Sequence, residues 1–467
     1  MQTSQFDFDL IVIGAGSGGY AAARTAVAAG WRTAVVEGGA QLGGLCILRG
    51  CMPTKALLYA AEVAHLARQA GTWGLATAPV SFDWSAVQAR KDRLIAEFAD
   101  YRARQLTDGR FTLVRDRARF RDPHTLELSA GRTLTAARFV IGTGSVVSAP
   151  PLPALAAAGY LTSDEALALP RLPRSLIVLG GGAVAVEFAQ LFARFGVTVT
   201  LVQRSAHLLR EFDADAAAVV EGVFRREGLQ VFTGTRLTGA GRCEHGKFVA
   251  FEQAGQTVRV EAEEILLALG RSPNTAGLGL EQAGVRTENG RIVTDAGMRT
   301  SAAHIGAAGD CTGPHEIVHI AIQQGELAVQ NLLGAGPPRS MDYRLLTAVV
   351  FTDPQLGVVG LTERAARAQG VPYLTASYPF NDHGKSLIME ALEGFVKLLA
   401  DPRTGQILGG ACVGPAGGEL IHEIVVAMQG RLTVQALAAL PHYHPTLAEI
   451  WTYPAEELAG DVSGRCG

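Results

Sequence analysis

The sequence has few of the features that mark secreted, nucleic-acid-binding or membrane proteins. Six cysteines in 467 residues are too few for the disulfide framework of a small secreted domain. The formal net charge is -3 and no run of basic residues occurs, which argues against nucleic-acid binding. The longest uncharged stretch, residues 139–163, contains three prolines, so it predicts a strand and a loop and not a membrane span.

The N-terminus also lacks the pattern of a secretory signal peptide. Asp7 and Asp9 directly precede an apolar strand, and no basic segment leads into an apolar run. Together with the low cysteine content, this favours a cytoplasmic protein.

Length and composition predict a globular protein of about three domains. Hydrophobic residues make up 48% of the chain and charged residues 18%, as in proteins with large cores. Glycine is abundant, at 55 residues without a short period, which suits tight strand-to-helix turns. Cys243, Cys311 and Cys412 have no cysteine nearby in sequence, so we expect small buried apolar residues. Cys466 lies in a Gly-rich tail, and its role stays open.

A long-range repeat organises the first half of the chain. Residues 9–13 predict a buried strand, which runs into GAGSGG at 14–19, an Ala-rich helix and a second strand at 33–37. The pattern returns 166 residues later (180 minus 14), with a strand at 175–179 and the turn GGGAVA at 180–185. Each unit predicts a βαβ with a Gly-rich turn at a helix N-terminus, the geometry that binds a pyrophosphate.

Two such turns in the right context are much more specific than one. The first has glycine at all three fingerprint positions, Gly14, Gly16 and Gly19. The second has Gly180 and Gly182, with Ala185 in the third place, which the fingerprint allows. We therefore predict two dinucleotide-binding sites.

Residues 43–55, GGLCILRGCMPTK, place two cysteines five positions apart before an apolar helical run at 56–67. No second Cys/His pair at ligand spacing completes a zinc site. Cys46 and Cys51 instead suit a redox dithiol. Cys51 is predicted at a helix N-terminus, where the helix dipole and nearby Lys55 favour the thiolate.

The remaining segments give coarser predictions. We expect a helix over 82–107, short strands over 111–145, further buried strands at 265–270 and 305–310, a hairpin formed by 395–400 and 406–413, and helices from about 417 and 433. Composition changes after Pro337-Pro338, which predicts a domain boundary near residue 339. The predicted fold class is α/β, with two Rossmann-like dinucleotide-binding domains and a C-terminal α+β domain.

The motifs occur in the order found in one enzyme family. They are the first Gly-rich turn, Cys-x4-Cys with Pro-Thr-Lys, VIGTG at 140–144, the second turn with Glu187, GRSPN at 270–274, Gly309-Asp310, and HPTLAE at 444–449. Nearly the whole chain thus resembles the pyridine nucleotide–disulfide oxidoreductases, which include dihydrolipoamide dehydrogenase, glutathione reductase and mercuric reductase. The resemblance implies an FAD-binding domain at 1–145 and 265–338, an NAD(P)H-binding domain at 146–264, and a dimerisation domain at 339–467.

The resemblance also implies which residues bind FAD. They are Gly14, Gly16 and Gly19 for the pyrophosphate, Glu37 for the adenosine ribose, Thr143 and Gly144 beside the flavin, and Asp310 near the ribityl phosphate. Glu37 could simply be a surface carboxylate that closes a strand. Its position 23 residues beyond Gly14 fits the ribose contact.

For the dithiol, the resemblance implies that Cys51 faces the flavin and that Cys46 attacks the substrate. It also implies that Lys55 and Glu187 form an ion pair beside the flavin. The alternative is an ordinary surface pair, which would contribute little.

His444 and Glu449 resemble the family's catalytic acid–base pair. The segment from Thr446 to Glu449 also fits a capping box before an apolar helix, and both interpretations could hold in part. His442 suggests a His-x-His metal site, but no acid or cysteine is placed to complete it, so we predict no metal.

The second nucleotide is predicted to be NADPH, with NADH possible. NAD sites usually place an acid at the end of the second strand, where this chain has Gln203, followed by Arg204 and Arg210. Two guanidiniums suit a 2′-phosphate, whereas the alternative is a solvated basic loop. The cofactor residues predicted here are Gly180, Gly182, Ala185, Arg204, Arg210 and, in the GRSPN motif, Gly270.

The resemblance predicts a homodimeric FAD enzyme that moves two electrons between NADPH, the Cys46–Cys51 pair and a disulfide or dithiol substrate. His444 would come from the partner subunit. Residues 339–467 carry apolar helices around 420–428 and 434–440, more apolar surface than so small a domain needs to bury alone. No nucleic-acid or membrane partner is expected.

Three alternatives stay open at this point. They are a dihydrolipoamide dehydrogenase working with NAD, a mercuric or metal-ion reductase, and a non-catalytic nucleotide-binding sensor or docking subunit. Mercuric reductases typically end in a vicinal cysteine pair and lack the His-Pro-Thr acid, whereas this chain keeps His444 and has only Cys466 in its tail. Glu326 stands where glutathione reductases tend to have a basic residue, which disfavours glutathione.

Overall fold

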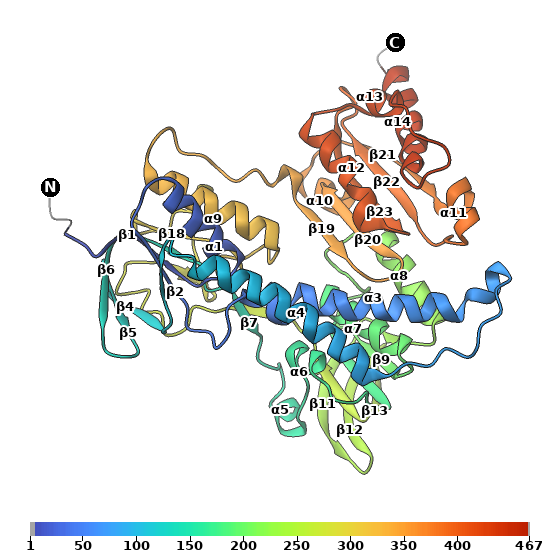
Figure 1. The fold of residues 1–467 in the computed structure, drawn as a ribbon. Coiled ribbons are helices and arrows are strands. Elements are labelled where there is room, and N and C mark those ends of the chain that lie inside the picture. Colours follow the sequence, from blue (N-terminus) through green and yellow to red (C-terminus); the bar gives the residue numbers. More distant parts are fainter. Residues whose placement is uncertain (1–4, 466–467) are drawn as a thin grey trace. The chain divides into compact units, whose positions relative to one another are not determined.

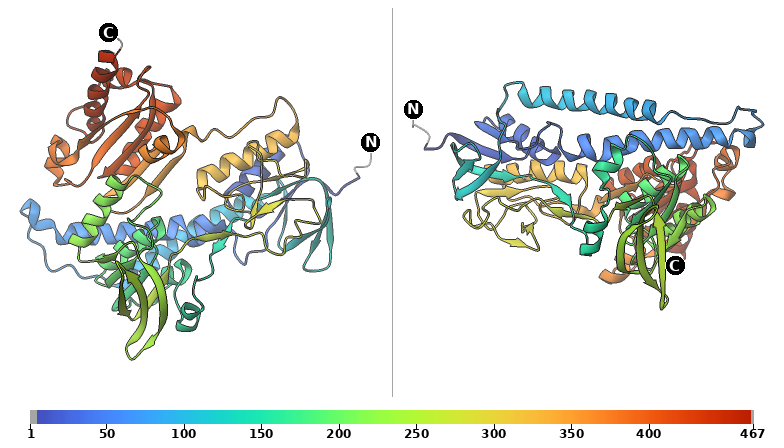
Figure 2. Two further views of the ribbon diagram at one scale, coloured as in Figure 1. Left: turned by 180° about the vertical axis from the view of Figure 1, so that it is seen from behind. Right: turned by 90° about the horizontal axis from the view of Figure 1, so that it is seen from below.

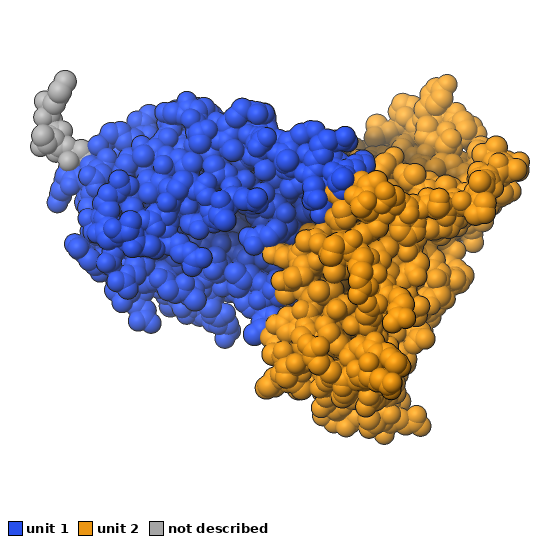
Figure 3. Space-filling model, turned by 60° about the horizontal axis from the view of Figure 1, so that its bottom comes forward, with its two compact units in different colours: residues 1–56, 89–149, 270–342 blue, residues 57–88, 150–269, 343–467 orange. Residues whose placement is uncertain are grey.

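The computed structural model describes residues 5–465 (Figure 1). By internal contacts the chain forms two compact units, each assembled from three segments (Figure 3). Unit 1 comprises residues 1–56, 89–149 and 270–342, and unit 2 comprises residues 57–88, 150–269 and 343–467.

Unit 1 is built on a mainly parallel sheet. Its strand order is β3-β2-β1-β6-β5-β4, and β18 also pairs with β6. Strands β1 (Phe8–Ile13) and β2 (Thr33–Val36) are buried along most of their length, as expected for parallel strands covered on both faces. The connecting helix α1 (Ser17–Ala28) packs its small alanines against α9 (Val318–Leu333). This is the βαβ unit that the first repeat predicts.

The other strands of unit 1 are β3 (Thr112–Val114), β4 (Ala118–Asp122), β5 (Thr125–Leu128), β6 (Thr133–Ile141), β7 (Ser145–Val147), β15 (Arg271–Pro273), β16 (Thr287–Glu288), β17 (Arg291–Ile292) and β18 (Ile305–Ala307). The short helix α2 (Gly44–Arg49) also belongs to unit 1. Helices α3 (Cys51–Arg68) and α4 (Trp84–Thr107) each contribute residues to both units, and η1 (Ala70–Trp73) lies between them in sequence.

The second repeat forms a four-stranded parallel sheet in unit 2, with the order β10-β9-β8-β14. The predicted strand 175–179 is β8 (Ser175–Leu179), followed by α7 (Ala183–Arg194) and β9 (Thr198–Val202). The sheet is completed by β10 (Gln230–Phe232) and β14 (Glu264–Leu267). The same segment holds α5 (Pro153–Ala158), α6 (Ser163–Leu167), α8 (Ala214–Arg226) and the antiparallel strands β11 (Arg236–Cys243), β12 (Gly246–Gln253) and β13 (Gln256–Ala262), which Figure 2 shows from two sides.

The C-terminal part of unit 2 is an antiparallel sheet with the order β19-β20-β23-β22-β21. The predicted hairpin is β22 (Phe395–Ala400) with β23 (Ile407–Gly414), and helix α12 (Gly417–Gln429) packs on β23 and β20. The remaining elements are η2 (Tyr343–Leu345), β19 (Thr347–Val350), β20 (Gln355–Gly360), α10 (Glu363–Gln369), β21 (Leu374–Pro379), η3 (Phe380–Asp382), α11 (Gly384–Met389), α13 (Val434–Ala438), η4 (Ala448–Trp451) and α14 (Thr452–Arg465).

Both βαβ units and the C-terminal α+β part confirm the predicted fold class. In the described part of the chain, none of the helices has the length and apolar character needed to cross a membrane.

Candidate active site

The first Gly-rich turn brings the backbone of β1, α1 and the segment after β6 close together. Gly14 has φ +100°, and a Cβ there would overlap the carbonyl oxygen of Gly142. Gly19 is similarly closed in by the carbonyl of Gly14, whereas nothing lies within 4 Å of a Cβ on Gly16, the N-cap of α1. The turn is therefore packed on one side and open on the other, so the helix N-terminus can receive an anionic group.

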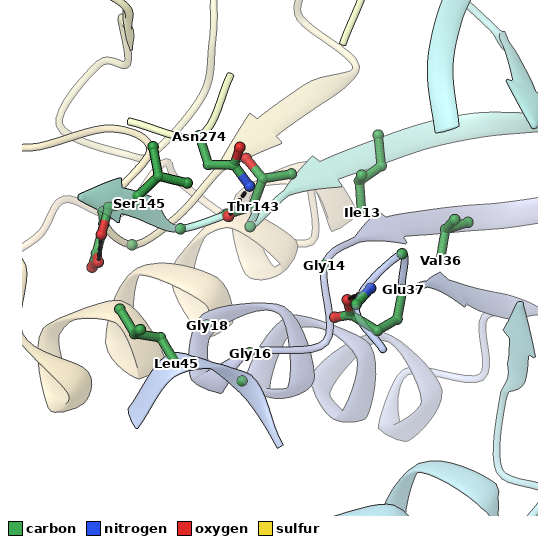
Figure 4. A pocket seen from close by; sticks show the side chains of 18 of the residues that line it. Ile13, Gly14, Gly16, Gly18, Val36, Glu37, Leu45, Thr143, Ser145 and Asn274 are labelled. Atoms are coloured by element: carbon green, nitrogen blue, oxygen red, sulfur yellow. Dashed lines mark hydrogen bonds between the residues drawn. The ribbon is translucent and has the colours of Figure 1, made fainter. Parts of the chain in front are cut away.

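Glu37, which follows β2, folds over this turn (Figure 4). Its Oε2 accepts a hydrogen bond of 2.8 Å from the Ala15 N–H, and its Oε1 accepts one of 2.6 Å from the Gly39 N–H. The carboxylate is thus held at the fingerprint turn and is not a surface group pointing into solvent.

A cavity of about 900 Å³ lies beside the turn, within unit 1. Its lining includes eight residues predicted from the sequence: Gly14, Gly16, Glu37, Cys46, Cys51, Thr143, Gly144 and Asp310. Its volume, the exposed helix N-terminus and the nearby carboxylate fit a dinucleotide such as FAD. Gly19 does not line the cavity but shapes it through its contact with Gly14.

A hydrogen-bonded network fixes the far wall of the cavity (Figure 4). Ser145 Oγ donates to Asp310 Oδ2 at 2.6 Å, and Arg271 Nε donates to Ser145 Oγ at 2.7 Å. Asn274 Nδ2 donates to the Thr143 carbonyl at 3.2 Å. The supporting roles of Ser145 and Arg271 are not predicted from the sequence, although both lie within or next to motifs noted there.

Gly270 lies at the start of the GRSPN motif, directly before β15. It has φ +108°, which favours glycine, and β15 pairs with β7 next to the Asp310 network. Gly270 therefore shapes the chain that delivers Arg271, and it is absent from the lining of the cavity.

The dithiol lies at the junction of two helices. Cys46 is in α2, a short helix that the sequence did not predict, and Cys51 is the first residue of α3, which confirms its predicted place at a helix N-terminus. The hydrogen bond to the Cys51 thiol, and then burial, raise the pKa of Cys46, and the charge of Lys55 only partly opposes this. Cys46 therefore lies within hydrogen-bonding reach of the Cys51 sulfur, and its thiol holds a proton more tightly than an ordinary cysteine does.

The other cysteines do not contribute to this site. Cys311 and Cys412 are buried, and burial raises the pKa of Cys311 to about 11, which makes it inert. The prediction of a buried Cys243 is wrong: this residue is partly exposed, because it ends strand β11 beside a turn. Cys466 lies outside the described residues.

The second turn, in unit 2, repeats the geometry of the first. Gly180 has φ +120°, and a Cβ there would overlap the carbonyl oxygen of Ala268. Gly182 is the N-cap of α7, and Ala185 is fully buried in the first turn of that helix, where a methyl group fits.

The loop after β9 carries the two arginines predicted to select NADPH. Gln203 is buried, and its Oε1 accepts a 2.9 Å hydrogen bond from the Arg204 N–H. The Leu209 N–H donates to the Gly181 carbonyl at 2.6 Å, which ties the loop to the Gly-rich turn. Arg204 is exposed, and Arg210 is also exposed, 2.8 Å from the Glu211 carboxylate.

Glu187 is only 3% exposed in α7, and its Oε1 accepts a 3.0 Å hydrogen bond from the Phe351 N–H. The interpretation as an ordinary surface pair is therefore wrong for this carboxylate. Lys55 belongs to unit 1 and Glu187 to unit 2, so their pairing stays a prediction.

His444 and Glu449 do lie together. His444 Nδ1 is 3.0 Å from Glu449 Oε2 and 3.2 Å from Oε1. The imidazole is 78% exposed, whereas the carboxylate side chain is 11% exposed. The capping-box interpretation is wrong, because η4 begins after Leu447 without a side-chain cap and the carboxylate of Glu449 turns to histidine instead.

Two further histidines lie in this region. His442 Nε2 is 2.7 Å from Glu423 Oε1, so it is engaged in a hydrogen bond with that carboxylate. His383, which sequence reasoning missed, places Nε2 3.5 Å from Glu449 Oε1. Among residues 5–465, no group of three or more His, Cys, Asp and Glu side chains is arranged to hold a metal ion.

Comparisons with known proteins agree with this geometry. The profile of the pyridine nucleotide-disulphide oxidoreductase family matches residues 8–325, and the profile of that family's dimerisation domain matches residues 346–455. A dihydrolipoyl dehydrogenase of Thermus scotoductus is 37% identical over 458 residues, which is 97% of each chain. A mercuric reductase of Streptomyces lividans is 37% identical over 466 residues, covering 98% of this chain and 97% of that protein.

Solved structures give the same result. The HOCl-induced flavoprotein disulfide reductase RclA from Escherichia coli superposes with a TM-score of 0.85 at 28% identity, covering 96% of this chain and 99% of that one. LpdA from Mycobacterium tuberculosis also gives a TM-score of 0.85, at 31% identity and the same coverage. The chain belongs to the pyridine nucleotide–disulphide oxidoreductase family, whose enzymes depend on FAD and use NAD(P)H as the electron donor.

Proposed function

We propose that this protein is a homodimeric, NADPH-dependent disulfide reductase in which Cys46 and Cys51 form the redox-active pair. The observation that carries the proposal is that both cysteines line the same cavity as the Gly14 turn and Glu37. A dithiol on the wall of a dinucleotide site is positioned for electron exchange with the cofactor in that site. FAD, when bound there, supplies the two-electron link between nicotinamide and dithiol.

The remaining chemistry belongs to the chain's own residues. Cys46 attacks one sulfur of the acceptor disulfide, forming a mixed disulfide and releasing the other acceptor sulfur as a thiolate. Cys51 then attacks the Cys46 sulfur, which forms the Cys46–Cys51 disulfide and releases the second acceptor sulfur. The acceptor has gained two electrons and two protons, and the cysteine pair has lost them.

His444 transfers the proton in these reaction steps. Because burial and the hydrogen bond to Cys51 hold a proton on Cys46, attack requires a base to take it. The imidazole of the partner subunit's His444 takes that proton and returns it to the leaving thiolate, while Glu449 orients the ring.

An active site that combines Cys46 of one chain with His444 of another requires a dimer. The C-terminal part of unit 2 has features that support dimerisation. It matches the family's dimerisation domain, and it exposes apolar side chains on and beside α12, with Val426 71% and Leu440 45% exposed. These side chains line a shallow apolar groove with Ala427, Leu432 and Leu437. A second copy of the chain would cover this surface.

The choice of NADPH rests on the loop after β9. At the position where NAD sites place a ribose-binding acid, Gln203 has its side-chain oxygen hydrogen-bonded to the Arg204 backbone. Arg204 and Arg210 are both exposed on a loop tied to the Gly-rich turn, where guanidiniums can bind a 2′-phosphate. Because the Glu211 carboxylate pairs with Arg210, Arg204 should contribute more than Arg210 to NADPH binding.

The substrate is proposed to be a small disulfide other than glutathione disulfide. Glu326, in α9, would repel a peptide carboxylate, and its ion pair with Arg24 of α1 engages the guanidinium beside it. A cytoplasmic location, where thiols are kept reduced, fits this activity.

One assay panel tests the proposal. Purified enzyme would be given NADPH or NADH with lipoamide, glutathione disulfide, small aromatic or aliphatic disulfides, or Hg(II). We expect the highest kcat/KM with NADPH and a small disulfide. Turnover confined to NADH with lipoamide would identify a dihydrolipoyl dehydrogenase, Hg(II) turnover a metal-ion reductase, and no turnover with any acceptor a non-catalytic role.

A further inference from the structure

His383 is a fully buried histidine that the proposed mechanism does not use. It lies between η3 and α11, and its ring packs edge-on against Phe380 and Tyr453, with centroids 6.5 and 6.4 Å away. Its Nε2 has no hydrogen-bond partner of good geometry among the described residues. Because a buried polar atom without a partner is costly, its placement 3.5 Å from Glu449 Oε1 requires an explanation.

The other ring nitrogen determines the protonation state. Nδ1 lies 2.9 Å from the Oγ of Ser386, which is itself fully buried. Burial lowers the pKa of His383 despite the Glu449 charge, so the ring is neutral and carries one N–H. A lone pair on Nε2 would repel the carboxylate, so the proton is on Nε2 and the Ser386 hydroxyl donates to Nδ1.

We propose that His383 is a positioning residue: its Nε2–H holds the Glu449 carboxylate from the side away from solvent, so that the carboxylate stays turned toward His444. The inference deepens the proposed function, on which the role of His444 rests. Glu449 then has a histidine on each side, one exposed and one buried, and only the exposed one exchanges protons with substrate.

The other titratable groups around the ring do not compete for this role. Tyr453 packs edge-on against His383 and face-on against Tyr378, at 3.9 Å between ring centroids. Burial and a hydrogen bond to Asp382 raise the pKa of Tyr378 to about 12, so it stays protonated over the working pH range. Glu449 and His444 are therefore the groups whose charge His383 can influence.

The test uses four variants of the FAD-loaded enzyme. His383→Leu removes the donor at similar volume, and His383→Gln keeps an N–H donor at the end of the side chain. Ser386→Ala removes the group that sets the tautomer. Phe380→Leu is the matched packing control, since it loosens the same core and leaves the polar contact intact.

We expect His383→Leu to lower kcat with disulfides about tenfold, because Glu449 then loses the group that holds it on its buried side, with KM for NADPH and acceptor little changed. The acid limb of the kcat–pH profile should move to lower pH, because His444 must be neutral to accept the Cys46 proton and a less well-held carboxylate stabilises protonated His444 less. His383→Gln should restore both, and Phe380→Leu should leave the pH profile unmoved. If His383→Leu and Phe380→Leu lower kcat equally and neither moves the kcat–pH profile, the proposal is overturned.

A readout without turnover separates this inference from the proposed function. In ¹³C-histidine-labelled protein, with the His444 signal assigned by its loss in His444→Gln, that signal should titrate at lower pH in His383→Leu. If the wild type reduces no disulfide, the proposed function fails while this titration still tests His383. If His383→Leu does not fold, Ser386→Ala decides: a smaller shift in the same direction supports the inference, and no shift overturns it.

Discussion

His444 Nδ1 lies 3.0 Å from Glu449 Oε2, which joins an exposed imidazole to a buried carboxylate five residues further along the chain. Such a contact fixes the ring and leaves its other nitrogen to face the solvent side.

Removing the members of this pair should impair disulfide turnover and leave the nucleotide half-reaction intact. We expect His444→Ala to lower kcat with disulfides by about 10²–10⁴-fold, the usual contribution of a general acid–base. Glu449→Gln, which keeps the shape of the side chain and removes its charge, should lower kcat with disulfides about tenfold. Stopped-flow flavin reduction by NADPH is the control, and a comparable loss in that step would contradict the assignment.

The two cysteines should give opposite signatures. Cys46→Ser should keep a long-wavelength absorbance from a Cys51 thiolate against oxidised flavin and lose disulfide turnover. Cys51→Ser should lose that band. Anaerobic titration followed by visible absorbance measures both, and the reverse pattern would exchange the two roles.

Nucleotide choice should depend on the loop after β9. Each charge-assisted contact to a 2′-phosphate contributes roughly 1.5–3 kcal/mol, so Arg204→Ala with Arg210→Ala should raise KM for NADPH at least about tenfold, with NADH little affected. Arg204→Ala alone should give most of the effect, since Arg210 is partly engaged by Glu211. A wild-type preference for NADH would disprove the prediction.

Lys397 should stabilise unit 2 in a pH-dependent way. Its buried Nζ lies 2.6 Å from Asp215 Oδ2, 3.0 Å from Glu363 Oε1 and 3.2 Å from Asp213 Oδ2. Burial would raise the pKa of Asp213, but backbone hydrogen bonds from Arg364 and Glu363 and the Lys397 charge hold it below its ordinary value. A folded pKa below the unfolded one contributes stability that is complete above about pH 4 and is lost as the pH falls through the folded value.

Lys397→Met leaves these carboxylates without their cation. It should therefore lower the free energy of unfolding by roughly 3 kcal/mol at pH 7. The difference in Tm from the wild type should shrink as the pH is lowered, because protonated carboxyls no longer need the ammonium. Arg225→Ala, which breaks the more exposed pair with Glu221, is the control and should cost less than about 1 kcal/mol. A Tm difference independent of pH would rule out this account.

Subunit complementation should reveal a shared active site. Cys46→Ser and His444→Ala homodimers should each be nearly inactive with disulfides. Unfolding and refolding them together should restore one working site in each mixed dimer. If mixed dimers form and no activity returns, His444 acts within its own chain or not at all.

Local signals in the sequence predicted most of the fold. The strand expected at 175–179 is β8 (Ser175–Leu179), and the helix expected over 82–107 is α4 (Trp84–Thr107). Buried apolar runs and Gly-rich turns are read from adjacent residues, so they need no tertiary information. The same holds for Cys51 at the start of α3.

Tertiary contacts settled what the local patterns could not. The 446–449 pattern fits both a capping box and a histidine partner, and the structure shows that Glu449 turns to histidine. His383 reaches Glu449 from a segment far earlier in the chain, and no periodicity links the two. Cys243 is partly exposed because it ends a strand beside a turn, which composition alone does not reveal.

The hydrogen bond from the Leu209 N–H to the Gly181 carbonyl anchors the loop of residues 203–210 to the Gly-rich turn through backbone atoms alone. Because this backbone contact does not depend on side-chain identity, substitutions at the exposed Arg204 and Arg210 leave it in place. Nucleotide preference can therefore change, in evolution or by design, through a few substitutions in this loop. Cys46, Cys51, His444 and Glu449 need not change with it.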